Sequence, residues 1–446
     1  MNKITHVTKR SGTIVPFTPN RITNAIYRTA VSVGGRDRSI AEGLSKQVVN
    51  ILELTTPLGQ SPHIEDIQDV VEKVLIENGH AKVAKEYILY RNERARRRAD
   101  SANRRSRPSG NIPWAKIWYV LNWAVDHNVH TISGLNERIA RGEFYDLVNE
   151  AESAYKIDIE NVTEQVSEKS ETLKLVIITG PSSSGKTTTT TKLGEGLKNE
   201  GLKLVTLNID NYFFDLEMHP KDEFGDYDFE TPQALDLALI NEHLIKLIAG
   251  DEVLVPYYDF KTGQRQDNVT PMRLHHNEII LIDSLHGLYP DMTSALPTEQ
   301  KFFLYLEPLL QMKDEQGQFI RWTDLRLIRR MLRDATHRAY DPRRTLEHWH
   351  YVRSSEMRNI IPYISTADYL INSAMPYELP LYSHRLLNSF AEWAAIYQDD
   401  PLREDAHARA ARVHKFLSVI TPVKDDSSVP ANSVLREFIG GSSYQY

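Results

Sequence analysis

The sequence contains no cysteine, which excludes disulfide bonds, cysteine-ligated zinc and thiol catalysis. It also lacks any apolar run approaching the roughly 18 residues that a membrane-spanning helix needs. A net charge of −7 over 446 residues argues against a protein that coats nucleic acid throughout. The hydrophobic content of 41% and charged content of 25% are ordinary for a globular protein, and the length predicts two or three domains.

Residues 180–187 read Gly-Pro-Ser-Ser-Ser-Gly-Lys-Thr and match the phosphate-loop pattern G-x-x-x-x-G-K-[ST] in full. An apolar run at 173–179 precedes the loop and is typical of a buried parallel strand, and a helical pattern follows at 188–198. Together these elements turn backbone N–H groups and a helix N-terminus toward one anion. Lys186 would reach the β- and γ-phosphates, and Thr187 would ligand Mg²⁺. A chance match on a glycine turn is the alternative, and the flanking strand and helix weigh against it.

The segment 171–375 alternates strand and helix patterns, which predicts a three-layer α/β/α domain with a mainly parallel sheet. Strands are expected at 173–179, 203–209, 278–283, 301–306 and 368–372. Asp210 follows the strand expected at 203–209 and Asp283 closes the one expected at 278–283, at the edge where parallel sheets bind ligands. A phosphoryl transferase needs one carboxylate to accept the proton of the acceptor hydroxyl and another to hold Mg²⁺. The alternative for each aspartate is a helix cap or a solvated turn.

An arginine-rich helix follows in the same segment. The spacing of its arginines places a stripe of guanidinium groups on one helix face, at Arg326, Arg329, Arg330 and Arg333. Such a stripe can neutralise a transferring phosphoryl group. An exposed basic helix is the alternative.

Six ordered stretches of this segment resemble the uridine kinase and phosphoribulokinase branch of phosphate-loop kinases. They are GPSSSGKTTTT at 180–190, IDNYF at 209–213, YDFETPQALD at 227–236, VPYYDFKTGQR at 255–265, IILIDSLHGLY at 279–289 and DLRLIRRMLRD at 324–334. The stretch SVLREFIGGSSYQY at 433–446 resembles the ending of bacterial uridine-kinase-like nucleoside kinases.

The resemblance implies roles for the matching residues. Asp210 would activate a nucleoside 5′-hydroxyl, and Asp283 would support the metal together with Thr187. The implied catalytic set is Lys186, Asp210, Asp283 and Arg329. ATP would contact Gly180, Ser182, Ser183, Ser184, Gly185, Lys186, Thr187, Thr188, Arg326, Arg330 and Arg333. The acceptor would contact Asp210, Tyr212, Glu230, Tyr258 and Arg326.

Two positions depart from the family pattern. Glu230 stands where uridine–cytidine kinases carry a ribose-binding aspartate, and Gly263 stands where they carry a base-contacting histidine. The base preference is therefore open. A sugar phosphate or a small hydroxy acid remains an alternative acceptor.

Residues 1–98 predict a small α+β domain, with a strand pair between Thr5 and Phe17 and a helix that has Ser61 as its N-cap and Pro62 in its first turn. The stretches VTKRSG at 7–12, FTPNRITNAI at 17–26 and VAKEYILYRNER at 83–94 resemble the ATP-cone, a nucleotide-sensing domain of ribonucleotide reductases and their repressors. The resemblance implies phosphate contacts at Lys9, Arg10 and Arg21 and allosteric control by ATP or dATP. Without cysteine, the chain has neither the radical cysteine of the reductase nor the zinc ribbon of the repressor.

Eight arginines lie within 91–107, ahead of Pro108-Ser-Gly110, and mark a domain boundary. A solvated linker is the favoured interpretation, and binding of an anionic partner such as RNA is the alternative. We expect a helical connecting region at 99–170 and a helical extension and tail at 376–446. The sequence therefore predicts an ATP- and Mg²⁺-dependent small-molecule kinase, most simply a nucleoside kinase and a homo-oligomer. No apolar signal core follows Met1, so a cytoplasmic location is expected. The rival from another class is a nucleotide-sensing regulator that binds nucleic acid.

Overall fold

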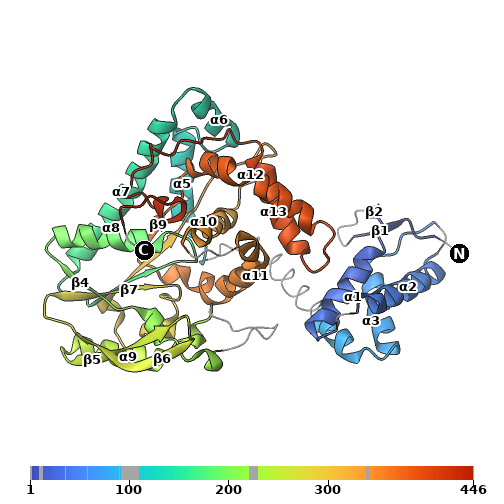
Figure 1. Cartoon of the computed structure of the whole chain (residues 1–446), viewed down its shortest axis with the longest axis horizontal. Coiled ribbons are helices and arrows are strands. Elements are labelled where there is room, and N and C mark those ends of the chain that lie inside the picture. Colours follow the sequence, from blue (N-terminus) through green and yellow to red (C-terminus); the bar gives the residue numbers. More distant parts are fainter. Residues whose placement is uncertain are drawn as a thin grey trace. The chain divides into compact units, whose positions relative to one another are not determined.

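The computed structural model describes residues 3–9, 14–35, 37–57, 59–89, 91, 110–219, 230–337 and 341–444 (Figure 1). Contacts divide the chain into two compact units. The smaller, N-terminal unit contains residues 1–109 together with 399–404, and the larger one contains residues 110–398 and 405–446. No helix in the described ranges is long and apolar enough to span a membrane.

The N-terminal unit is a small α+β domain, as predicted. Strand β1 (His6–Thr8) pairs antiparallel with β2 (Ile14–Pro16), and helices α1 (Asn20–Ser32), α2 (Arg38–Thr55) and α3 (Ile64–Glu77) follow. The apolar faces of the helices share one core, which includes Ile26, Val48 and Leu75. The predicted Ser61-Pro62 cap is wrong by two positions. The N-cap is His63, in a capping box with Asp66, because the Pro62 carbonyl oxygen accepts the N–H of Thr8 at 2.9 Å.

A five-stranded parallel sheet forms the centre of the larger unit. Its strands are β4 (Lys203–Thr206), β7 (Glu278–Ser284), β3 (Leu175–Thr179), β8 (Lys301–Glu307) and β9 (Tyr369–Asn372), in this spatial order. All four neighbouring pairs are parallel. The five strands predicted from apolar runs are therefore confirmed, and their carboxyl ends share one edge of the sheet.

Two hydrophobic cores cover the two faces of the sheet and make the domain three-layered. Along β3, Val176 and Ile178 lie in one core and Leu175 and Ile177 in the other, as the two-residue period of a strand requires. Helices α7 (Phe144–Glu168), α8 (Lys186–Asn199), α10 (Trp322–His337) and α12 (Glu378–Tyr397) contribute to the first core. Helix α9 (Leu237–Ile248) contributes to the second.

A hairpin of β5 (Glu252–Asp259) and β6 (Gln264–Arg273) lies outside the main sheet. No strand is predicted from the sequence for either half of this hairpin. Pro256 interrupts the β5 pattern at a register shift between Val255 and Tyr257, and most of β6 is exposed.

Helices α5 (Trp114–Asp126), α6 (Ile132–Ala140) and α7 occupy the region expected to be connective. Their buried side chains belong to the same core as the sheet, so residues 114–168 are part of the larger unit. The unit is completed by α11 (Pro342–Asn359), α13 (Glu404–Leu417) and α14 (Arg436–Ile439). The side-chain amide of Asn136 links α6 to the segment that follows α13. Its nitrogen donates to the Val419 carbonyl oxygen at 2.7 Å, and its oxygen accepts the Thr421 N–H at 2.8 Å.

Candidate active site

The phosphate loop joins the end of β3 to the start of α8 and needs glycine at both of its conserved positions. A Cβ on Gly180 would lie 2.2 Å from the Leu306 carbonyl oxygen. Gly185 has φ +95°, and a Cβ there would lie 2.3 Å from Cγ2 of Val434. Ser183 also takes a left-handed conformation, with φ +60°. Such backbone strain is typical of ligand-binding loops.

The loop fits a polyphosphate. The N-cap of α8 is Gly185, which offers no side chain to the first-turn N–H groups. The hydroxyls of Ser183 and Ser184 are buried and have no hydrogen-bond partner in the described part of the chain. The Lys186 ammonium donates to the Gly180 carbonyl oxygen at 3.0 Å, and Thr187 is exposed beside it. These donors would hold the phosphates of ATP, and the Thr187 hydroxyl could ligand Mg²⁺.

Asp283 lies at the carboxyl end of β7, beside the end of β3. Burial raises its pKa to about 6, the Lys186 ammonium opposes this shift, and the carboxylates of Glu437 and Asp210 add to it. Lys186, Glu437 and Asp210 therefore lie within electrostatic reach of Asp283. Asp210 is exposed on the short helix that follows β4. The structure thus brings together three residues that the sequence predicted at the site, Lys186, Asp210 and Asp283.

No group of three or more candidate metal ligands gathers among the described side chains. In phosphoryl transfer, proteins usually bind Mg²⁺ through one or two protein oxygens together with substrate phosphates. Asp283 and Thr187 would supply those oxygens.

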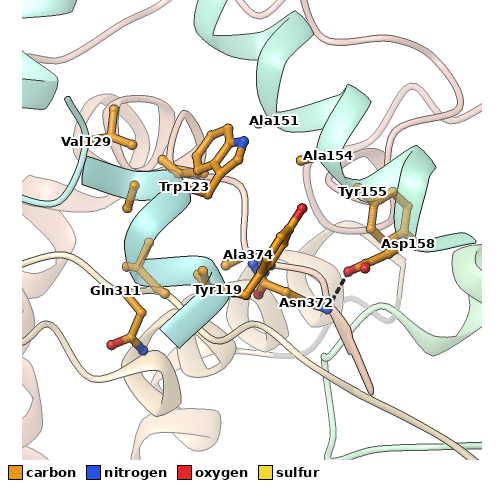
Figure 2. A pocket seen from close by; sticks show the side chains of 14 residues that line it. Tyr119, Trp123, Val129, Ala151, Ala154, Tyr155, Asp158, Gln311, Asn372 and Ala374 are labelled. Atoms are coloured by element: carbon orange, nitrogen blue, oxygen red, sulfur yellow. Dashed lines mark hydrogen bonds between the residues drawn. The ribbon is translucent and has the colours of Figure 1, made fainter. Parts of the chain in front are cut away.

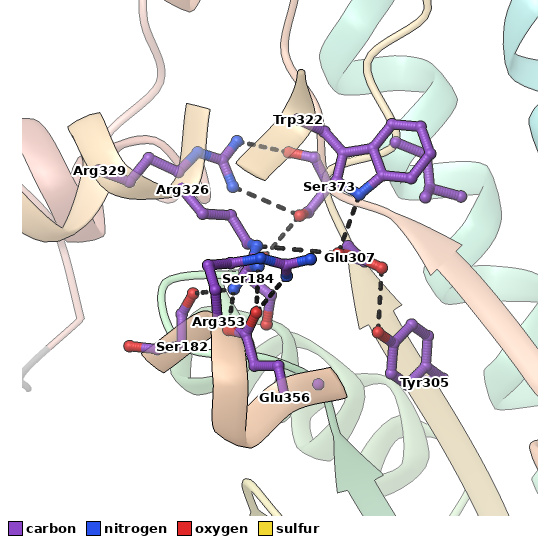
Figure 3. Close-up of polar contacts among 12 residues, drawn as sticks. Ser182, Ser184, Tyr305, Glu307, Trp322, Arg326, Arg329, Arg353, Glu356 and Ser373 are labelled. Atoms are coloured by element: carbon purple, nitrogen blue, oxygen red, sulfur yellow. Dashed lines mark hydrogen bonds and ion pairs between the residues drawn. The ribbon is translucent and has the colours of Figure 1, made fainter. Parts of the chain in front are cut away.

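The arginine stripe of α10 is split between the protein interior and the site. Figure 3 shows the polar contacts around the two buried members, Arg326 and Arg329. Arg326 is fully buried: it donates two hydrogen bonds to Glu356, at 2.5 and 2.7 Å, and one to the Ser182 carbonyl oxygen at 3.1 Å. Arg329 is fully buried and donates to Glu378 at 2.7 and 2.8 Å and to the Ser373 carbonyl oxygen at 2.7 Å. Both guanidinium groups are occupied by buried carboxylates. The predicted contacts of Arg326 and Arg329 with ATP, acceptor or transferring phosphoryl group therefore do not fit this geometry, and Arg326 instead braces the loop.

Arg330 and Arg333 each lie one turn after one of the buried arginines and face the loop, with 23% and 20% of their side chains exposed. Arg330 Nη1 lies 3.4 Å from the Ser182 hydroxyl oxygen and 3.3 Å from Glu230 Oε1. It therefore connects the loop to the residue predicted to contact the acceptor. Arg333 Nη1 lies 3.9 Å from Glu437 Oε1.

The predicted acceptor residues have different surroundings. Tyr212 is fully buried, its hydroxyl lies 2.8 Å from His243 Nδ1, and burial raises the pKa of the phenol. This position in the core does not fit the predicted contact with the acceptor. Tyr258 packs against Phe213 and Phe260, at ring distances of 5.5 and 5.0 Å, and its hydroxyl has no partner among the described residues. Residues 227–229, from a matching stretch, lie outside the described residues.

Gly263 has φ +68°, and a Cβ at this position would lie 2.8 Å from Leu216 Cβ. The turn therefore excludes a larger side chain at the position where the family resemblance implies a base-contacting histidine.

Two residues at the site were not found from the sequence. His286 is 3% exposed, neither of its ring nitrogens has a partner in the described ranges, and burial together with Lys186 lowers its pKa to about 3. Its place three residues after Asp283 was the available signal. Glu437 accepts the N–H of Thr188 at 3.3 Å and its hydroxyl at 3.0 Å. No local signal pointed to Glu437, because the two residues are 249 positions apart.

A separate cavity of about 30 Å³ lies between α5, α7 and the end of β9 (Figure 2). Tyr119, Trp123, Tyr155, Asp158 and Asn372 are among its lining residues. It has room for one or two water molecules, so it is too small for a nucleotide. The Tyr155 hydroxyl lies 2.6 Å from the Thr189 hydroxyl and ties α7 to the first turn of α8.

In the N-terminal unit, Lys9 and Arg21 are exposed, and Arg10 lies outside the described residues. Arg91 is the one residue of the arginine-rich segment that the structure describes. It pairs with Glu65 and Glu72 at 2.8 Å each and with Asp69 at 2.5 Å, and so fixes the end of its helix to α3.

Comparison with known proteins places this geometry in the phosphate-loop kinases. Residues 175–379 match the family described as Phosphoribulokinase / Uridine kinase, and residues 5–96 match the ATP cone domain. The chain is 26% identical to the uridine kinase of Deinococcus deserti, over 44% of this chain and 84% of that protein. It is 27% identical to uridine-cytidine kinase 2-B of Danio rerio, over 39% of this chain and 63% of that protein.

The N-terminal unit has a different relative. It is 44% identical to the vitamin B12-dependent ribonucleoside-diphosphate reductase of Thermoplasma acidophilum, over 20% of this chain but only 12% of the reductase. The chain is thus an ATP-dependent kinase, in which the segment that matches the ATP cone domain precedes the segment that matches the Phosphoribulokinase / Uridine kinase family.

Proposed function

We propose that this kinase transfers the γ-phosphoryl group of ATP to the 5′-hydroxyl of a nucleoside. The observation that carries the proposal is the phosphate loop with Lys186 at the end of β3, together with Asp283 near the carboxyl end of the neighbouring β7 and Asp210 on the short helix after β4. The names of the uridine kinase relatives favour a nucleoside as the acceptor.

In this mechanism Asp210 accepts the proton of the acceptor hydroxyl as its oxygen bonds to the γ-phosphorus and the bond to the β-phosphate oxygen breaks. Lys186 and the loop N–H groups hold the phosphates. Thr187 and Asp283 would hold Mg²⁺, which neutralises phosphate charge. Arg330 and Arg333, the partly exposed members of the stripe, would stabilise the charge of the transferring group. Glu230, held by Arg330 at 3.3 Å, would orient the hydroxyls of the acceptor.

The acceptor is tested by a screen for ATP-dependent phosphorylation of nucleosides, sugar phosphates and small hydroxy acids. We expect turnover with a nucleoside and weak discrimination among bases, because Gly263 carries no side chain that could form a hydrogen bond with a base. The Lys186→Ala variant is the matched control, and it should show no turnover. Turnover confined to sugar phosphates or hydroxy acids would overturn the nucleoside assignment.

We also propose that ATP or dATP binds the N-terminal unit and regulates the kinase. The match to the ATP cone and the exposed cations Lys9 and Arg21 support this. Coupling of this kind typically changes affinity about 5- to 150-fold.

A further inference from the structure

The segment 433–441 packs against the phosphate loop and is firmly anchored. Val434 fills the space beside Gly185, and the hydroxyls of Ser433 and Tyr377 lie 3.0 Å apart. Arg436 Nη2 donates to the carbonyl oxygens of Asp426 and Val429 at 2.8 Å each. Phe438 is fully buried, 5.0 Å from the guanidinium of Arg329. The position of Glu437 is therefore fixed by its neighbours.

Glu437 accepts hydrogen bonds from two donors of Thr188, its N–H and its hydroxyl. Thr188 is the third residue of α8, so its N–H is one of the first-turn donors that have no partner within the helix. In a phosphate loop these N–H groups cradle the α- and β-phosphates of the nucleotide. Carboxylate and phosphate oxygens are both strong acceptors for such donors. A bound nucleotide and Glu437 therefore require the same group.

The charges around Glu437 extend this competition. Its second oxygen lies 3.9 Å from Arg333, which is also a candidate phosphate ligand. The carboxylate is 4% exposed, and water screens it poorly. It also contributes to the raised pKa of Asp283. A polyphosphate in the loop would therefore bring negative charge close to a buried carboxylate.

We propose that Glu437 competes with the phosphates of the nucleotide for Thr188 and Arg333, and so sets the affinity of the phosphate loop for nucleotide. Glu437 thereby weakens the binding of ATP and promotes the release of ADP. The inference rests on the proposed function only in placing a nucleotide in the loop, and the identity of the acceptor does not enter.

The test measures ADP binding to the full chain by titration calorimetry. Glu437→Gln keeps the shape and an acceptor but removes the charge, so the Kd for ADP should fall about fivefold to twentyfold. Glu437→Met removes the charge and the acceptor at similar length, and it should also tighten binding. Glu392→Gln is the matched control: it removes one exposed carboxylate on α12, and it should leave the Kd unchanged. Thermal unfolding without nucleotide checks that each variant is folded.

An unchanged or higher Kd in both Glu437 variants would overturn the competition. A higher Kd would mean that Glu437 supports the nucleotide site. Failure of the wild-type chain to bind ADP would overturn the nucleotide site itself and this inference with it.

Discussion

At the scale of single residues, the site contains two ionisable side chains, those of Asp283 and His286, whose burial disfavours their charged forms. Asp283 ends a strand of aliphatic side chains, and His286 lies buried nearby with both ring nitrogens unpartnered in the described chain. An unpaired buried polar group typically destabilises a fold by about 1–3 kcal/mol. Groups held in this way are candidates for contact with substrate or metal.

The Asp210→Asn variant should keep ADP affinity but lower kcat by about 10²–10⁴-fold, because it removes the base and keeps the shape. Steady-state kinetics and ADP titration measure the two effects. The exposed Asp251→Asn variant is the control for loss of one charge. Loss of ADP affinity with kcat unchanged would contradict the role of Asp210 as the base.

The Asp283→Asn variant should be more stable than the wild type at about pH 8 and nearly equal to it at about pH 4. Between its ordinary pKa of 3.8 and its folded pKa of about 6, Asp283 keeps a proton in the folded chain that the unfolded chain has lost. The free energy of unfolding of the wild type therefore falls as pH rises through this window, by up to about 3 kcal/mol. Denaturant unfolding at several pH values measures the difference.

The variant should also lose kinase activity, and Mg²⁺ with ADP should stabilise it less than the wild type, because the amide is a weaker metal ligand. The exposed Asp291→Asn serves as control. Equal stabilities of variant and wild type at both pH values would contradict the burial of this charge.

The His286→Leu variant should unfold at a higher temperature but turn over at least about tenfold more slowly. Leucine leaves no buried nitrogen unpaired, yet it cannot bond the transferring phosphoryl group or the acceptor. Calorimetric melting and kcat at saturating ATP test both parts. Undiminished kcat together with higher stability would show that His286 takes no part in turnover.

At the scale of elements, helix α10 has two functions. Two of its arginines fix the helix in the protein interior, and two others face the phosphate loop. The buried turn, with Arg326 and Arg329, fixes the helix to Glu356 and Glu378. The next turn presents Arg330 and Arg333 to the loop. The buried ion pairs of Arg326 and Arg329 thus set the positions of Arg330 and Arg333, which are partly exposed.

We therefore expect Arg329→Ala to lower the stability of the fold and Arg330→Ala to lower catalysis. Arg329→Ala leaves Glu378 buried without its partner, which typically destabilises a fold by about 3–5 kcal/mol. Arg330→Ala should leave stability nearly unchanged and lower kcat/KM. Unfolding curves and kinetics separate the two. A stable Arg329→Ala protein with reduced kcat would restore the predicted catalytic role of Arg329.

The elements show how far the sequence can predict this protein. The five sheet strands could be predicted, because strands buried on both faces are continuous apolar runs. The phosphate loop and the two aspartates could be placed, because parallel strands end at one edge. The spacing of the arginines identified a face but not its buried turn, since their partners Glu356 and Glu378 lie 30 and 49 positions away. The exposed hairpin and Glu437 gave no local pattern.

At the scale of the whole molecule, the two units have separate cores. Helices α5–α7 share the core of the larger unit, residues 110–398 and 405–446, which is the kinase unit. A chain that begins near Ile112 should therefore retain kinase activity but lose its response to ATP and dATP. A chain that begins near Leu173 should not fold, because it lacks Val148, Tyr155 and Val162 of the core.

Activity and particle mass, measured against nucleotide concentration, test the first truncation, since association between chains is the expected means of control. Lys9→Ala combined with Arg10→Ala should abolish the response in the full chain. Identical responses of the intact and shortened proteins would show that the N-terminal unit is only structural.

The two hydrogen bonds of the Asn136 amide have a consequence for the order in which the protein folds. Its partners Val419 and Thr421 follow it by 283 and 285 positions, and Glu437 follows Thr188 by 249. Contacts across such separations require the closure of very long loops, and they slow folding. The segments on either side of the phosphate loop therefore meet late, after the local helices and hairpins have formed. The kinase unit should thus acquire its nucleotide site only in the final steps of folding.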